Sequence, residues 1–126
     1  MGSRERKAIG RSERVEMQFL EAVKGRCPDN GRVLEVLGEL YTRTGRYEDG
    51  LKVDLELARI NPRESVVWYN LACSYALVGD KDASLAALGK ALELGYHDLE
   101  WLRRDKDLEI LRGDSRFEAM LKKARR

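Results

Sequence analysis

The residues that could support catalysis or metal binding are few, and they lack the spacing that such chemistry needs. The one histidine, His97, follows Gly95 and has no cysteine or carboxylate at a zinc-motif spacing. Asp105, Asp107 and Asp114 suggest a calcium loop, but the EF-hand spacing and its terminal glutamate are absent, so we expect them to cap short helices. The glycines are isolated, and no serine lies in a nucleophile motif. The sequence therefore predicts a protein that is not an enzyme, with no metal site and no cofactor.

The cysteines and the first residues of the chain bear on its compartment. Cys27 and Cys73 show no motif spacing, and no run approaches the roughly 18 apolar residues of a membrane span. The opening Met-Gly-Ser-Arg-Glu-Arg-Lys lacks the apolar stretch of a secretory signal, and Arg6 stands where myristoylation needs Ser or Thr. We therefore expect free thiols, a cytoplasmic location and no membrane partner.

The charges argue against a nucleic-acid partner. The chain has 24 Lys and Arg against 22 Asp and Glu, a net charge of +2, which is too balanced for a surface that follows a phosphate backbone. Basic residues do gather near the two ends: Arg4, Arg6, Lys7, Arg11, Arg14, Lys122, Lys123, Arg125 and Arg126. Clusters of this kind usually keep chain ends solvated.

One motif occurs twice in the chain, 34 residues apart. The copies are Leu34-x-x-Leu37-Gly38-x-x-Tyr41 and Trp68-x-x-Leu71-Ala72-x-x-Tyr75. Gly45 and Gly79 keep the same offset and are expected to end a first helix in a left-handed conformation. A period of this length predicts stacked helix–turn–helix units. Second helices are expected over 47–60 and 81–94, where Asn61-Pro62 and Gly95 stop them.

These positions resemble the signature of the tetratricopeptide repeat family. The resemblance implies an all-α fold: helical hairpins stacked as a short right-handed solenoid with N- and C-terminal capping helices. We expect one domain over 1–126, with a capping helix in 1–30, repeats in 31–64 and 65–98, and capping helices in 99–126. The stretch 105–117 is similar to a segment that closes many bacterial proteins of this family, which suggests a bacterial source.

Three residues depart from the family pattern. Gly50 and Ser84 stand where alanine is preferred, and Asp54 stands where a large apolar residue is preferred. Gly50 costs the helix about 1 kcal/mol, which packing can absorb. An unpaired carboxylate in a repeat interface would be expensive, so we expect Asp54 to turn to the surface or to bond Tyr75 or another donor.

The resemblance also implies a concave groove lined by the first helices of the repeats. By register, the partner-binding candidates are Glu35, Glu39, Val66, Tyr69, Asn70, Cys73 and Leu77. Some family members hold a C-terminal carboxylate with a clamp of Lys, Asn and Arg. This chain matches that clamp at Asn70, and Arg104 is the one further candidate. Carboxylates at the other clamp positions, including Glu100, would repel that group, so we expect no binding of chaperone tails.

The function expected from this groove is non-catalytic binding of a protein or peptide segment that carries apolar anchors and a Lys or Arg. Tyr69 is the expected anchor, and Asn70 could hold the ligand backbone. In a competing interpretation the C-terminal segment fills part of the groove and Tyr69 packs against it. A further alternative is a self-assembling scaffold module, a homo-oligomer formed through the groove or an uncovered solenoid end.

Overall fold

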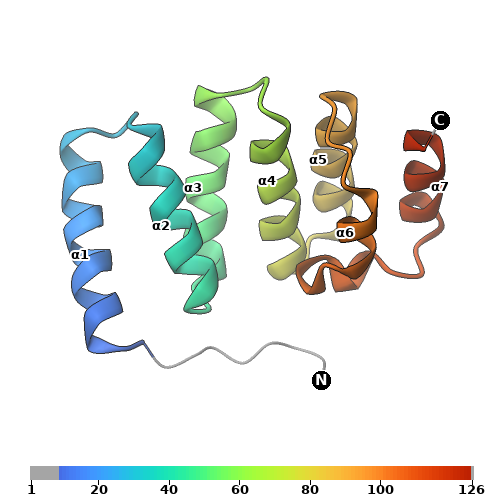
Figure 1. Ribbon diagram of the computed structural model, residues 1–126. Helices are drawn as coiled ribbons and strands as arrows, with labels where there is room; N and C mark the ends of the chain where they lie inside the picture. Colours follow the sequence, from blue (N-terminus) through green and yellow to red (C-terminus); the bar gives the residue numbers. More distant parts are fainter. Residues whose placement is uncertain (1–8, 126) are drawn as a thin grey trace. The chain divides into compact units, whose positions relative to one another are not determined.

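The computed structural model describes residues 9–125, and these residues form helices and no strand. The elements are α1 (Arg11–Arg26), α2 (Gly31–Arg43), α3 (Tyr47–Ile60), α4 (Ser65–Leu77), α5 (Lys81–Glu93), α6 (Leu99–Arg104), the 3-10 helix η1 (Lys106–Leu111) and α7 (Ser115–Ala124) (Figure 1). The all-α class and the sequential helical hairpins are confirmed. The opening heptapeptide, with Arg4, Arg6 and Lys7, and the final Arg126 lie outside the described residues.

The chain divides into two compact units, Met1–Ile60 and Asn61–Arg126. In the first unit, α2 and α3 pack as a hairpin, and α1 packs against α2. The two hairpin helices approach most closely at Gly38, where an added Cβ would lie 3.3 Å from the Asp54 carboxylate and 3.6 Å from Val53. The absence of a side chain at Gly38 therefore avoids a tight contact with that carboxylate. The boundaries proposed for one domain over 1–126 stay a prediction.

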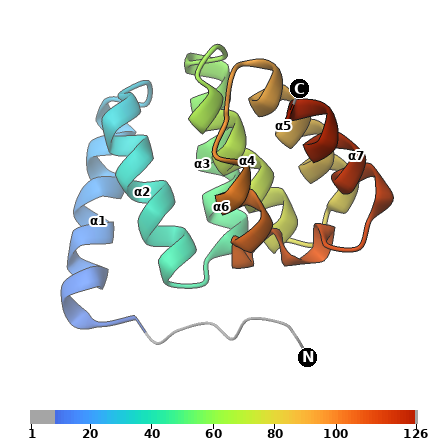
Figure 2. The ribbon, with the colours of Figure 1, turned by 45° about the vertical axis from the view of Figure 1, so that its right-hand side comes forward.

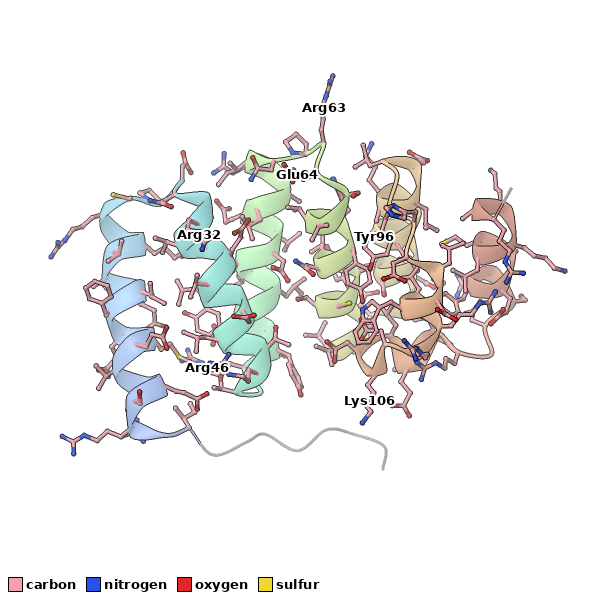
Figure 3. The ribbon with its side chains drawn as sticks, viewed as in Figure 1. Arg32, Arg46, Arg63, Glu64, Tyr96 and Lys106 are labelled. Atoms are coloured by element: carbon pink, nitrogen blue, oxygen red, sulfur yellow. The ribbon has the colours of Figure 1, made fainter. Side chains whose placement is uncertain are left out.

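The capping helix α1 is attached to the hairpin by a polar contact around Tyr41. The Tyr41 hydroxyl donates a hydrogen bond of 2.5 Å to Glu21 of α1, and the Arg46 guanidinium lies 4.8 Å from the centre of the Tyr41 ring. Arg46, labelled in Figure 3, also pairs with Asp49 at 2.8 Å and lies 3.9 Å from Glu21. Burial, together with the hydrogen bond to Glu21, raises the pKa of Tyr41.

Asp54 does not turn to the surface. Its side chain is buried in the first unit, with one carboxylate oxygen facing Gly38, and it takes part in an interaction there. Of the two alternatives expected for Asp54, rotation to the surface is therefore wrong, and a bond to Tyr75 or another donor stays a prediction. The absence of a Cβ at Gly38 leaves the space that this carboxylate fills.

In the second unit, α4 and α5 form a hairpin, η1 packs against α4, and α7 packs against α5 (Figure 2). The Ser84 hydroxyl is fully buried and donates a 2.7 Å hydrogen bond to the carbonyl of Ala72. A serine in place of alanine therefore adds a bond between the two hairpin helices. The core of this unit also includes large apolar side chains from the C-terminal elements: Leu102, Leu108, Leu111, Phe117 and Leu121.

The helix ends follow the sequence closely. Gly45, Gly79 and Gly95 have φ of 82°, 90° and 104°, as expected for residues that end helices in a left-handed conformation. α5 ends at Glu93, one residue earlier than expected. Asp105 and Asp114 accept hydrogen bonds from backbone N–H groups at the starts of η1 and α7, so their capping roles are confirmed, whereas Asp107 lies inside η1.

We expect Tyr41→Phe to lower the free energy of unfolding by about 1 kcal/mol, because it removes the hydrogen bond to Glu21 that joins α1 to α2. Urea denaturation followed by circular dichroism measures this difference. Tyr47→Phe is the matched control, since no hydrogen bond of the Tyr47 hydroxyl is found within residues 9–125. Equal losses in the two variants would contradict a stabilising role for the Tyr41–Glu21 bond.

Asp114 should titrate far below an ordinary aspartate. Hydrogen bonds from the side chain and backbone of Arg116 lower its pKa from 3.8 to about 2. The unfolded chain then binds more protons than the folded chain between these values, so the contribution of Asp114 is complete above pH 3.8 and is lost as the pH falls through about 2. NMR titration of the carboxyl carbon measures the pKa, and Arg116→Gln should raise it. An ordinary value in the wild type would show that the Arg116 contact does not persist in solution.

Candidate partner-binding surface

The five candidates on α4 lie on one side of the helix but differ in exposure. We call Val66, Asn70 and Leu77 the open set, and Tyr69 and Cys73 the closed set. Val66 is 54% exposed, Asn70 is exposed and Leu77 is half-buried. Tyr69 and Cys73 are only 7% and 8% exposed. The five side chains therefore share one side of the helix but differ sharply in accessibility, and their role in binding a partner stays a prediction.

The closed set is covered by residues 96–111, which we call the closing segment. Tyr96, labelled in Figure 3, lies between α5 and α6, and its ring stacks on Tyr69 with centroids 4.6 Å apart and planes 9° apart. The Tyr69 hydroxyl donates a hydrogen bond to the Asp105 carboxylate. Tyr69 is thus enclosed within its own unit and, in this arrangement, does not present the open ring that an anchor for a partner requires.

Asp105, which belongs to the closing segment, makes most of the polar contacts between this segment and the closed set. One carboxylate oxygen accepts from Tyr69 and lies 3.7 Å from the Cys73 sulfur, and the other accepts from the backbone N–H of Asp107 at 2.9 Å. The Arg112 guanidinium donates to the Asp105 carbonyl at 2.9 Å. Each of these bonds holds part of the closing segment in place, so Asp105 acts as a structural carboxylate.

The closed set and the tyrosine that covers it, Tyr96, are poorly placed to react with molecules from solvent. Burial raises the pKa of Tyr96, and the charge of Asp98 and the nearby Cys73 raise it further. Reaction of a cysteine requires an accessible thiolate, and the Cys73 sulfur is buried beside a carboxylate. Cys27, in contrast, is exposed. The closed set therefore contains no activated nucleophile.

The acidic candidates belong to the first unit. Glu35 and Glu39 are both exposed on α2, one helical turn apart. A Glu39 oxygen lies 4.0 Å from the Arg43 guanidinium, which pairs more closely with Glu13 at 3.2 Å. The two glutamates therefore place negative charge on the open side of α2, where Arg43 neutralises it only in part.

Two surface features were missed by the sequence reasoning. Trp101 and Ile110 are large apolar side chains of the C-terminal elements, and they are 44% and 38% exposed. Their neighbours Leu102 and Leu111 point inward and are fully buried. Adjacent side chains of a helix point in different directions, but the sequence does not mark which of the two apolar neighbours is buried.

Two kinds of feature were sought in the described residues, metal-ligand clusters and membrane-spanning helices. Across residues 9–125, no group of three or more His, Cys, Asp or Glu side chains is arranged to hold a metal ion. Within the same range, no helix has the length and apolar character needed to cross a membrane.

The comparisons with known proteins agree with this architecture. Residues 66–94, which include most of α4 and all of α5, match the family described as tetratricopeptide repeat. A protein of Arabidopsis thaliana that is named as chloroplastic is 38% identical over 88 residues, which is 68% of this chain and 26% of that relative. The chain therefore spans about a quarter of the length of this relative. A plant relative lends no support to the expected bacterial source.

We expect Tyr69→Phe to loosen the closing segment and to raise the labelling rate of Cys73 about tenfold. The variant removes a hydrogen bond to a buried carboxylate, and a loss of about 1.4 kcal/mol corresponds to that factor. Maleimide labelling in a Cys27→Ser background measures the rate, because Cys73 is then the one remaining thiol. Tyr75→Phe is the control and should leave the rate unchanged. A rate in Tyr69→Phe equal to the control would show that this bond does not hold the segment.

Proposed function

We propose that this chain, a tetratricopeptide-repeat protein, is a non-catalytic protein–protein interaction module that binds an extended or helical segment of a partner. The family match supports a role in protein interaction, and the surface of α4 supports the mode of binding. The partner's own identity is left to the experiment below.

The observation that carries the proposal is the exposed pair Val66 and Asn70 on α4. This helix is otherwise enclosed, because α5 packs on one side and the closing segment on another. A valine that stays 54% exposed on such a helix offers an apolar contact, and an amide one turn later can both donate to and accept from a ligand backbone. Half-buried Leu77 extends the same face.

Within the first unit, taken by itself, the charge of the two candidates on α2 favours a contact with a Lys or Arg of a partner. Glu35 and Glu39 are exposed in the first unit and carry negative charge that Arg43 offsets only in part. Attraction of this kind adds specificity and speeds association, and it weakens as salt screens it. A partner that ends in a free carboxylate would meet repulsion from these side chains, as the sequence predicts.

We place the module in a reducing compartment, because exposed Cys27 and buried Cys73 are both free thiols. The cytoplasm is our proposal on the basis of the sequence. The relative is named as chloroplastic, so the chloroplast is the competing location.

The test compares three immobilised proteins: the wild type, Val66→Ser/Asn70→Ala, and the control Lys52→Ala/Leu55→Ser. The control also removes one exposed apolar and one exposed polar side chain, but from α3. We expect a protein from the source lysate to be retained by the wild type and the control and lost from the α4 variant. A peptide from that protein should then bind the α4 variant at least tenfold more weakly in titration calorimetry.

Circular dichroism verifies that all three proteins are equally helical, which is expected because the four changed side chains are exposed. Retention of the same proteins by all three columns would contradict the proposal. The partner surface would then lie outside Val66 and Asn70.

A further inference from the structure

The helix α1 has a second apolar face that its own unit does not cover. Met17 is 3% exposed and points toward α2, as the packing of the first unit requires. Val15 and Phe19 are 58% and 65% exposed, and Ala22 is exposed as well. Spacings of four and three residues place these three side chains in one stripe, on the side of α1 opposite Met17. We call Val15, Phe19 and Ala22 the outer stripe.

Solvent exposure of the outer stripe is unfavourable unless another molecule covers it. Phe19 is the most exposed large apolar side chain within residues 9–125. Single apolar side chains on a surface are common, but neighbours aligned on one helix face indicate an interaction surface. The inner contacts of α1 do not depend on this stripe, because the bond to Tyr41 comes from Glu21 and the apolar contact from Met17.

The charges around the outer stripe have one dominant sign. Arg11 and Arg26 lie in line with it at its two ends, whereas Arg14 and Glu16 lie on its two sides, each roughly a quarter turn around the helix. The three arginines are exposed, and none forms an ion pair with another residue of the described range. The acidic residues of α1 are mostly occupied on the inner side, since Glu13 pairs with Arg43 and Glu21 bonds Tyr41. Glu16 is the remaining exposed acid of the helix. The outer side of α1 is therefore an apolar stripe with a basic rim.

We infer that the outer stripe and its basic rim form a docking surface for an amphipathic helix with acidic flanks, carried by a partner protein. Such a helix presents apolar side chains at a spacing of three and four residues to Val15 and Phe19, and its Asp or Glu residues meet Arg11, Arg14 and Arg26. This surface lies in the first unit and does not depend on the proposed binding at α4.

The same charges argue against the two other occupants that this chain could supply. A second copy would bring its own three arginines to the contact, and like charges repel in any pairing of the two stripes. The residues before α1 carry Arg4, Arg6 and Lys7, so their charge does not complement the rim either.

The test uses two synthetic helical peptides with the same leucine stripe, one flanked by Glu and the other by Lys. Fluorescence anisotropy measures their binding to the wild type, Phe19→Ala, Arg11→Glu/Arg26→Glu and the control Leu55→Ala, which removes an exposed apolar side chain from α3. We expect the Glu-flanked peptide to bind the wild type, with affinity that falls as salt is added. Phe19→Ala and the charge-reversed variant should each weaken it at least tenfold, and Leu55→Ala should not.

Several results would overturn the inference. Equal affinity for the two peptides would show that the basic rim does not select the partner. An affinity for the Glu-flanked peptide that Phe19→Ala leaves unchanged would show that the stripe does not bind it. A dimer in analytical ultracentrifugation that Phe19→Ala dissolves would identify a second copy as the occupant. Binding to vesicles of anionic phospholipid without binding to the Glu-flanked peptide would identify a membrane surface instead. The variant Val66→Ser/Asn70→Ala should bind the Glu-flanked peptide like the wild type. The experiment therefore separates a failure of the outer-stripe proposal from a failure of the α4 proposal.

Discussion

Both units depend on two helices approaching closely at a small residue. In the first unit that residue is Gly38, where a side chain would make a tight contact with the Asp54 carboxylate. In the second unit it is Ala72, which is fully buried and whose carbonyl accepts the hydrogen bond from Ser84. Close approach buries one face of each helix, and dense packing then makes the contact specific. The remaining faces of α2 and α4 must be covered by something else, and this need accounts for α1 and for the closing segment.

The two covers are attached by similar chemistry, although their sequences are unrelated. In each unit the first hairpin helix carries a buried tyrosine whose hydroxyl donates to a carboxylate of the cover. Tyr41 meets Glu21 of α1, and Tyr69 meets Asp105 of the closing segment. A hydrogen bond to a charged acceptor is stronger than one between neutral groups, and it is directional, so it fixes where the cover lies as well as stabilising it. Apolar packing alone would leave that position less well defined.

The covers also decide which side chains remain available for binding. The closing segment removes Tyr69 and Cys73 from solvent and leaves Val66 and Asn70 in it. In the first unit α1 covers the hairpin but presents its own outer stripe to solvent. The described residues therefore leave exposed side chains on two different elements, one set mixed apolar and polar and the other apolar with arginines at its ends.

The sequence by itself determined the repeat period, the helix ends and the face on which each α4 candidate lies. These features are local: glycine tolerates positive φ, aspartate caps a helix start, and side chains three or four residues apart share a face. The tertiary structure alone decided which of those faces is covered. Tyr69 and Asp105 are 36 residues apart, and Tyr41 and Glu21 are 20 apart, so no local pattern connects them. A periodic stripe marks a face as apolar but carries no information on what packs against it, because that depends on where a distant segment folds back.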